Sequence, residues 1–447
     1  MDLKPANKNI MKKTSLILLS TLCALAANAT DINGSTDSAS RPVVKDIADG
    51  QDVRILPNAD APEGSALVSM KDATVKSLEL TEKSGTGYTL SFGNTTIDNN
   101  GSEKDFALRN SSKFNWYLTS QSLNLVNSGS DTAVSNYEMG TATILGEDAA
   151  VNVNTNAAFS GTTLIFKSGA AENVGVSLTI GSASKTVNVC YDVAATTFDN
   201  ASKLIVNSGS TFTSGKTAVL NFGANAAFEI AGTFNYGNTA SKLDFNGKGK
   251  ILNSGVMTLS QALRINSGAV VEIASGRADS AIRKGDEGDG RVILAGGTLK
   301  IASKDAIATN IGLDANTAST ISISADNSFQ SLYFNENTRL SLILTDNAKA
   351  SFKGVGAATS VDMSIEGFAA DSVFFNSNTW WNNALITATD AEGNVYQKDQ
   401  LELVAAGEDF VQYGKYVLSV KQIPEPSTYA AVFGALALGL ALYRRRK

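Results

Sequence analysis

The chain has 447 residues, of which 43% are hydrophobic and 18% charged, with a net charge of −6 and no histidine. The missing histidine excludes imidazole-based triads and dyads, and it excludes histidine-ligated zinc. A near-normal apolar content and a small net charge per residue argue against a fully disordered chain.

The N-terminal segment, residues 1–29, has the pattern of a secretory signal peptide. A basic start at Lys12–Lys13 precedes an apolar run, and Ala27 and Ala29 form an A-x-A cleavage site. The apolar run is too short to span a bilayer comfortably. We expect export through the secretion translocase and cleavage by signal peptidase, with Met11 as an alternative start of translation. The competing interpretation is a buried N-terminal helix.

Residues 30–65 are polar and carry three prolines, and we expect them to form a leader and the N-terminal cap of the following region. Residues 66–352 have the pattern of many short β-strands. Alternating runs rich in Val, Ile, Leu, Phe and Thr are separated by clusters of Gly, Asn, Ser and Asp. Prolines are absent between Pro62 and Pro424. The pattern predicts an all-β region.

The strand region repeats a short motif in which an apolar run ends in a polar residue, Ser and Gly. The motif occurs at 127–129, 167–169, 207–209, 253–255 and 266–268. The first three glycines are spaced by 40 residues, which predicts turns of about 20 residues and hence a β-solenoid. Gly and Asn would form the corners, and Asn would form ladders along the stack.

The predicted fold is a right-handed parallel β-helix, and roughly 13 turns of about 21 residues would fill residues 66–352. The pattern resembles the β-helix passenger regions of autotransporters, including their strand repeats. A pair of β-sandwiches is the alternative, because sandwiches also have short strands at close spacing.

Residues 353–423 depart from the repeat, and their segments 372–383 and 399–422 predict long hairpin-like strands. We expect them to form a C-terminal strand cap that covers the last unpaired edge. Trp380 and Trp381 lie among asparagines and are a candidate sugar contact, with packing inside the cap as the alternative. Neighbours in a strand point to opposite faces, so at most one of the two would face outward.

The C-terminal segment, residues 424–447, combines three features in order. A Pro-Glu-Pro motif is followed by an apolar run, Tyr429–Tyr443, and then by a basic cluster. At about 1.5 Å per residue the run reaches roughly 22 Å, which predicts a single transmembrane helix with its basic end in the cytoplasm. The residues concerned are the motif Pro424, Glu425 and Pro426, the anchor Tyr429, Phe433, Leu436, Leu440 and Tyr443, and the cluster Arg444, Arg445, Arg446 and Lys447.

This order of features resembles the PEP-CTERM sorting signal. The resemblance implies recognition by an exosortase, a membrane cysteine transpeptidase. It also implies that the protein is first anchored in the membrane and then sorted to the cell surface or the extracellular matrix, in association with exopolysaccharide. A plain tail anchor with an accidental Pro-Glu-Pro is the alternative.

Candidate chemistry is sparse elsewhere. Asp286, Glu287 and Asp289 lie in the charged loop 283–291, but their spacing does not match a calcium motif, so we expect a solvated loop and no metal or cofactor. Cys190 is the cysteine that remains after the signal peptide is removed. We expect it to be a buried small residue in a strand.

These observations predict a non-enzymatic exported protein with a structural or adhesive role, and with exopolysaccharide or surface glycans as partners. Without the two terminal segments, the chain keeps 29 basic and 41 acidic residues, a charge that disfavours nucleic acid as a partner. The alternative function is a polysaccharide-active β-helix enzyme, a lyase or a hydrolase. A Thr-rich ice or crystal binder would need a regular T-x-T ladder, of which the sequence has isolated cases.

Overall fold

The chain divides into two compact units, Met1–Asn310 (unit 1) and Ile311–Lys447 (unit 2). Both are built as β-solenoids, with about 13 turns in all, so the predicted β-solenoid is confirmed and the pair of β-sandwiches is wrong. In the computed structural model, the described residues are 29–35, 40–48, 50–56, 66–70, 72–80, 88–92, 95–98, 106–107, 113–119, 122–168, 175–199, 201–276, 279–421, 433–438 and 444.

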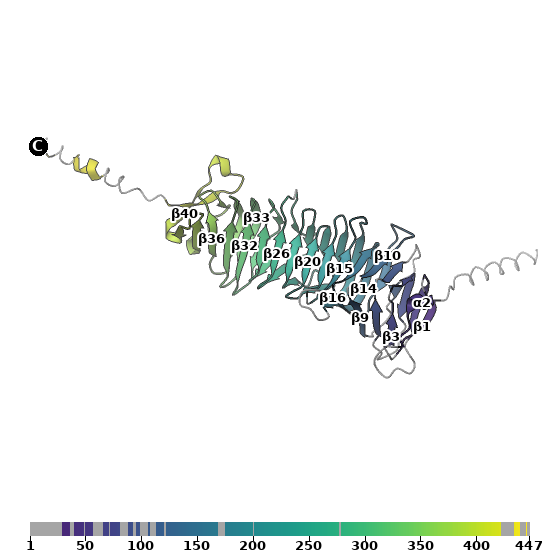
Figure 1. Cartoon of the computed structure of the whole chain (residues 1–447). Coiled ribbons are helices and arrows are strands. Elements are labelled where there is room, and N and C mark those ends of the chain that lie inside the picture. The colour runs from purple at the N-terminus through teal and green to yellow at the C-terminus, as the bar shows by residue number, and fades with distance from the viewer. Residues whose placement is uncertain are drawn as a thin grey trace, which may run out of the picture. The chain divides into compact units, whose positions relative to one another are not determined.

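Unit 1 contains two long parallel sheets, sheet I and sheet II, and Figure 1 shows β10, β15, β20 and β26 of sheet I side by side. Sheet I consists of β4 (Thr74–Val75), β7 (Thr95–Asp98), β10 (Ser122–Val126), β13 (Ala149–Asn154), β15 (Val176–Ile180), β17 (Lys203–Val206), β20 (Ala227–Ile230), β23 (Lys248–Ile251), β26 (Val270–Ile273) and β29 (Thr298–Ile301).

Most turns add two strands to sheet II, and the long strands β14 and β16 each pair with two shorter ones. Sheet II consists of β3 (Ala66–Ser69), β6 (Tyr88–Phe92), β8 (Phe106–Ala107), β9 (Lys113–Thr119), β11 (Ser135–Glu138), β12 (Thr141–Glu147), β14 (Ala157–Ser168), β16 (Asn188–Phe198), β18 (Thr211–Ser214), β19 (Val219–Phe222), β21 (Thr233–Tyr236), β22 (Leu243–Phe245), β24 (Val256–Leu259), β25 (Leu263–Asn266), β27 (Ile282–Lys284), β28 (Val292–Ala295) and β30 (Ile307–Ala308). A third, three-stranded parallel sheet of unit 1 accompanies a short helix and consists of β1 (Thr30–Asn33), β2 (Asp52–Leu56) and β5 (Ser77–Leu80), with the helix α2 (Val44–Ala48).

Unit 2 has the same two kinds of sheet and ends in antiparallel strands. Its sheet I consists of β32 (Ala318–Ile323), β34 (Arg339–Leu344), β36 (Asp362–Phe368), β38 (Leu385–Asp390) and the antiparallel β39 (Val395–Gln397). Its sheet II consists of β31 (Ile311–Leu313), β33 (Asn327–Phe334), β35 (Ala350–Ala357), β37 (Val373–Phe375) and the antiparallel pair β40 (Leu401–Ala405) and β41 (Tyr416–Val420). Three 3-10 helices connect these strands, η1 (Trp381–Asn383), η2 (Lys398–Gln400) and η3 (Glu408–Phe410).

The turns differ in length, so the predicted constant period near 20 is wrong. The turn that leads from Ser122 to its partner Ala150 is clearly longer than the turn that leads from Ala227 to its partner Lys248. The 40-residue spacing arises because the motif ends strands of both sheets: 127–129 and 207–209 follow sheet I strands, while 167–169 begins at the end of β14 in sheet II. The motif therefore occurs at strands of both sheets, so its spacing is not the length of a turn.

The core lies between the sheets and contains columns of aromatic rings. In-register parallel strands repeat about every 4.8 Å, so equivalent side chains stack directly on one another. The ring centroids of Phe166, Phe198 and Phe222 are 4.9 Å apart at each step. A second column of unit 1 contains Tyr137, Phe159, Tyr191, Phe212 and Phe234, and a column of unit 2 contains Phe329, Phe352 and Phe375.

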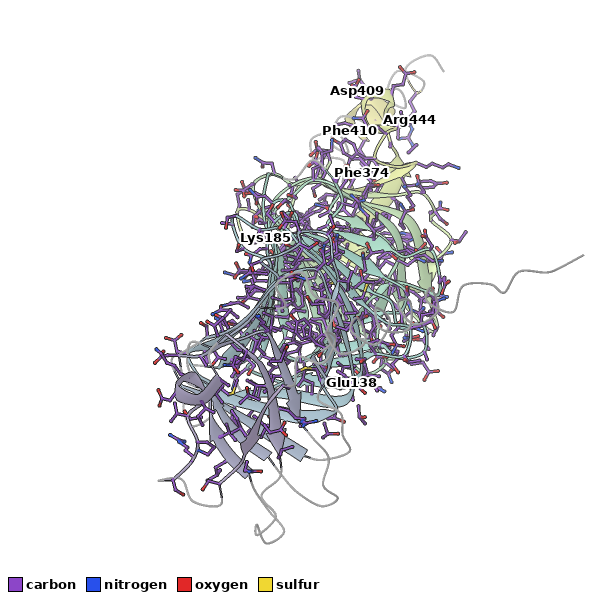
Figure 2. The ribbon with its side chains drawn as sticks, turned by 90° about the vertical axis from the view of Figure 1, so that its right-hand side faces the viewer. Glu138, Lys185, Phe374, Asp409, Phe410 and Arg444 are labelled. Carbon is purple, nitrogen blue, oxygen red and sulfur yellow. The ribbon has the colours of Figure 1, made fainter. Side chains whose placement is uncertain are left out.

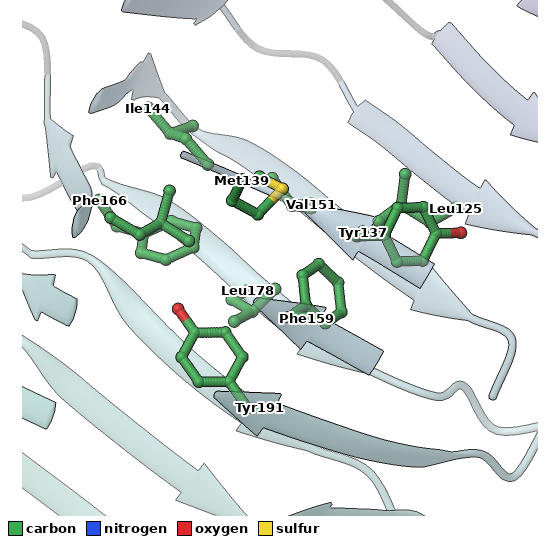
Figure 3. A pocket seen from close by; sticks show the side chains of 10 residues that line it. Leu125, Tyr137, Met139, Ile144, Val151, Phe159, Phe166, Leu178 and Tyr191 are labelled. Carbon is green, nitrogen blue, oxygen red and sulfur yellow. The ribbon is translucent and has the colours of Figure 1, made fainter. Parts of the chain in front are cut away.

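A gap in the core of unit 1 is too small for a ligand. Figure 3 shows it between Tyr137, Phe159, Tyr191 and their neighbours, and its volume is about 10 Å³. A single water needs roughly 10–15 Å³ together with polar partners. This part of the interior is therefore packed core, and the two larger hollows described below lie on outer faces.

The predicted glycine and asparagine corners are present. Gly209 and Gly268 have φ angles of 78° and 79°, and Asn316 and Asn337 have φ angles of 59° and 53°. Glycine adopts this left-handed conformation without steric cost, and asparagine tolerates it better than most residues. Predicted Asn ladders occur as short steps, such as Asn152 Nδ2 donating to Asn124 Oδ1 at 2.9 Å.

One of the two segments of 353–423 that were predicted to form long hairpin-like strands does not do so. Residues 399–422 hold the antiparallel pair β40–β41, but 372–383 is a short strand followed by a loop and η1, because the chain bends there to bury Trp380. Within the described residues, no helix has the length and apolar character needed to cross a membrane. The predicted span 429–443 is described at 433–438, where it is helical.

Candidate functional site

A charged hollow of about 550 Å³ lies on unit 2 and is called here the cationic pocket. Strands β34, β36 and β38 form its floor, and the segment that contains η2 forms its wall. Its lining residues are Arg339, Asp362, Leu385, Ile386, Thr387, Gln397, Lys398, Asp399 and Lys421. Three of these side chains are cationic and two are carboxylates, so the pocket carries a local positive excess on an acidic chain.

The floor is a row of outward side chains on stacked strands. Asp362 pairs in register with Leu385 of the next turn. Arg339 Nε lies 3.7 Å from Asp362 Oδ1, a loose ion pair between partly exposed groups. Leu385 is 60% exposed, which is unusual for a leucine and leaves an apolar surface beside the charges.

The wall is held in place by the antiparallel strand β39. Thr387 of β38 pairs with Gln397 of β39, so a hydroxyl and an amide lie side by side. Gln397 and Gln400 form a capping box around η2, and the Lys421 ammonium donates to the Asp399 carbonyl at 2.6 Å. These bonds fix two lysines, Lys398 and Lys421, at the same rim.

Lys398 has an unusual environment for a cation. Its ammonium lies 3.7 Å from the centroid of the Trp381 ring, a close cation–π contact. Burial, with the nearby positive charge of Lys421 as a second cause, lowers the pKa of Lys398. Within the described residues, the ion pairs include none with Lys398 or Lys421. An anion at this rim would therefore relieve repulsion between two cations.

The two tryptophans of the sequence analysis take different roles. They were expected to be strand neighbours, and this is wrong, because they lie at the start of η1. Trp380 is 8% exposed, donates from Nε1 to the Ser377 carbonyl at 2.8 Å and packs on Phe375, so it is a packing residue. Trp381 is partly exposed and contacts the pocket through Lys398.

A second hollow, of about 340 Å³, lies on the outer face of sheet II in unit 1. Glu138, Ser160 and Asp192 lie in register on three successive turns there, and Figure 2 shows Glu138 at the surface. The two carboxylates are thus two strands apart, roughly 10 Å at the backbone. Inverting glycoside hydrolases place their two carboxyl groups about 6.5–9.5 Å apart.

Cys190 lines this second hollow, and the expectation that it is buried is wrong. It is exposed on β16, whereas its neighbours Val189 and Tyr191 point into the core. Asn188 and Asp192, two residues away on either side, share its outward direction. Those polar neighbours were a signal in the sequence that could have shown which face Cys190 occupies.

Rows of charged side chains run along the outer face of sheet I in unit 1. Glu229, Lys250, Glu272 and Lys300 pair in register on four successive strands, with alternating sign. Lys300 Nζ lies 3.1 Å from Glu272 Oε1. Alternating charges on neighbouring strands attract, so the row stabilises the register and keeps the face solvated.

Two carboxylates of the loop 283–291, which was expected to be solvated, form ion pairs with cationic side chains. Glu287 pairs with Lys216 at 2.7 Å, and Asp289 pairs with Arg291 at 3.4 Å. Among the described residues, no group of three or more acidic or sulfur side chains has the arrangement of a metal site.

The sorting residues lie mostly outside the described residues. This applies to Ala27, Pro424, Glu425, Pro426, Tyr429, Leu440, Tyr443, Arg445, Arg446 and Lys447. Ala29 directly precedes β1, and Phe433, Leu436 and Arg444 are exposed helical residues.

The cationic pocket itself was not foreseen. Its cations come from three segments that lie far apart in the sequence, and no local motif marks them.

Comparison with known proteins adds no assignment, because no protein-family model, no curated protein and no solved structure matches this chain.

Proposed function

We propose that this chain is an exported surface or matrix protein whose solenoid is a structural and adhesive scaffold for exopolysaccharide. The observation that supports this best is the register of its outer faces, on which polar and charged side chains recur on successive strands, as in the row Glu229, Lys250, Glu272 and Lys300. A repeated face can meet a polymer at many points, and many weak contacts add up to firm attachment.

The proposal includes a route to the surface. The signal peptide 1–29 is removed on export, and exosortase recognises Pro424–Pro426, with 429–443 as a transmembrane helix and 444–447 on the cytoplasmic side. The solenoid is right-handed, and the antiparallel strands of 353–423 cap its final edge. In support, β40 and β41 add antiparallel pairing where the parallel stack ends.

Two measurements on protein purified from the native cell envelope test this proposal. Mass spectrometry of the termini should find an N-terminus at Thr30 and a C-terminus near Pro424–Thr428. Co-sedimentation with the host's insoluble exopolysaccharide should retain the protein in the pellet. A chain intact through Lys447 would contradict sorting, and a protein that stays in the supernatant would contradict adhesion.

A second candidate function, a glycan-cleaving enzyme, rests on Glu138 and Asp192 facing one hollow across Ser160. In this case Glu138→Gln and Asp192→Asn would each abolish release of soluble sugars from the polysaccharide. Glu336→Gln, an exposed glutamate of unit 2 outside both hollows, is the matched control. Polysaccharide that stays intact with the unaltered protein rules this candidate out.

A further inference from the structure

We infer that the cationic pocket binds a uronate unit, a sugar ring that carries a carboxylate, of an acidic polysaccharide. This deepens the proposed function and rests on it for the meeting of protein and polysaccharide. The pocket has the size of an ordinary ligand site, about 550 Å³. It lies within unit 2, since its lining residues run from Arg339 to Lys421.

The carboxylate is recognised by the two lysines at the rim. Lys421 lies close enough to disfavour the charge of Lys398, and the face of Trp381 covers Lys398 on one side. A ligand carboxylate between them would replace like-charge repulsion with charge-assisted hydrogen bonds. Arg339 is held at 3.7 Å from Asp362 and can turn toward the same anion.

The sugar ring is recognised by the neutral residues of the floor. Thr387 and Gln397 lie side by side across β38 and β39 and supply a hydroxyl and an amide for ring hydroxyls. Leu385, 60% exposed, supplies an apolar surface for the C–H side of a ring. A mere anion site would not need this combination of apolar and neutral polar surface.

The two carboxylates of the pocket select against a ligand with dense negative charge. Asp362 is paired with Arg339, while Asp399 lies at the rim and offers its backbone carbonyl to Lys421. Three cations and two carboxylates leave an excess of one positive charge. One carboxylate per sugar matches this excess, although the chain as a whole is acidic and would repel a polyanion elsewhere.

Calorimetric titration of the mature protein with a hexameric oligogalacturonate tests the inference. We expect binding of this probe and about 10-fold weaker binding of its carboxyl-reduced, neutral counterpart. Lys398→Gln and Lys421→Gln should each weaken oligogalacturonate binding roughly 10-fold, the scale of one charge-assisted hydrogen bond. Lys421→Arg, which keeps the charge, should retain binding. Lys353→Gln, an exposed lysine on β35 of sheet II, is the matched control and should change nothing.

Three results would overturn the inference: equal affinity for the neutral and the charged oligomer, unchanged affinity in both lysine variants, or equally tight binding of inorganic sulfate, which would show an anion site without sugar recognition. Circular dichroism of each variant excludes misfolding. If the protein sediments with exopolysaccharide but the lysine variants bind oligogalacturonate normally, the inference fails and the proposed function stands. If oligogalacturonate binds through the lysines but exopolysaccharide retains no protein, the proposed function fails instead.

Discussion

The ring of Phe198 stacks on that of Phe222 with centroids 4.9 Å apart and planes 11° from parallel. The contact follows from the pairing of β16 with β19, which places the two residues in register. Phe166 stacks on the other face of Phe198 at the same distance. Phe198 is therefore enclosed on both sides, and each ring of the column holds its neighbours at the spacing of the strands.

Replacement of Phe198 by alanine should lower the free energy of unfolding by about 3–5 kcal/mol, because the residue is fully buried and both stacked neighbours lose their partner. Phe198→Leu, which keeps much of the volume, should cost clearly less. Urea unfolding followed by circular dichroism measures both. Equal losses for the two variants would contradict this expectation, because they would show that the volume retained by leucine contributes nothing to stability.

Gly249 should not tolerate a side chain, because a Cβ atom there would lie 2.2 Å from Cζ of Phe228. Phe245, whose centroid is 4.7 Å from that of Phe228, limits the movement of the ring. Gly249→Ala should therefore cost about 1–3 kcal/mol of stability. Gly312→Ala is the matched control in a strand, since no atom beyond its own chain neighbours lies within 4 Å of its Cβ position, and it should stay within about 0.5 kcal/mol. Thermal unfolding of the two variants decides.

Lys349 attaches the loop before β41 to the solenoid of unit 2. Its ammonium lies 2.7 Å from Asp371 Oδ2 and 5.2 Å from the ring centroid of Phe410, which packs near Phe374 (Figure 2). Lys349→Met keeps the aliphatic stem and loses the charge, so the loop 406–415 should detach more often. Limited proteolysis should then cut this loop faster than in the unaltered protein. Lys353→Met, at an exposed lysine of β35 outside the loop, serves as the control, and equal cleavage rates in the Lys349 variant and the unaltered protein would contradict the role of Lys349.

Asp390 should make the β38–β39 turn sensitive to acid. The Asn394 side chain donates to Asp390 Oδ2 at 2.8 Å, and this bond is the first of several that lower the pKa of Asp390. Because the pKa is lower in the folded state, the carboxylate stabilises the turn above its ordinary pKa of about 3.9. That contribution is lost as the pH falls through the folded value.

Hydrogen exchange measured by mass spectrometry checks this expectation. Peptides that cover 386–397 should lose protection below about pH 4, after correction for the intrinsic exchange rate, while peptides of the buried column around Phe198 keep theirs. Asp390→Ala should lose the protection already at pH 7. Protection that is independent of pH in the unaltered protein would contradict this account.

Cys190 should react with a maleimide in the native protein, because its side chain is exposed on the outer face of β16. One label per mature chain is expected without denaturant, because the proposed removal of the signal peptide takes Cys23 with it. Labelling that appears only in urea would show that the outer face of β16 is covered. Cys190→Ser should abolish labelling and leave stability unchanged within about 0.5 kcal/mol.

The strands could be predicted from the sequence because side-chain direction in a strand depends on local alternation. The burial pattern of β17, in which Leu204 and Val206 are buried while Lys203 is exposed, follows directly from its apolar-polar order. Cys190 was predicted to be buried because cysteine is often buried. The alternation of the strand decides instead, since Cys190 shares its face with the polar residues at 188 and 192. Segment 372–383 was predicted to be a long strand because it is rich in aromatic residues. Aromatic residues are also buried outside strands, as Trp380 is at the start of a 3-10 helix.

By itself, the sequence determined the solenoid and its corner residues, since each depends on neighbours along the chain. Only the tertiary structure decided which outward residues meet. Arg339, Lys398 and Lys421 line one pocket because β34, β36, β38 and β39 lie side by side. Glu138 and Asp192 line one hollow because β14 lies between their strands. Turn lengths vary along sheet I of unit 1, as the pairing of β10 with β13 and of β20 with β23 shows. The number of residues between two positions therefore does not tell whether they pair on neighbouring strands. Which residues lie side by side depends on the length of each turn of the solenoid.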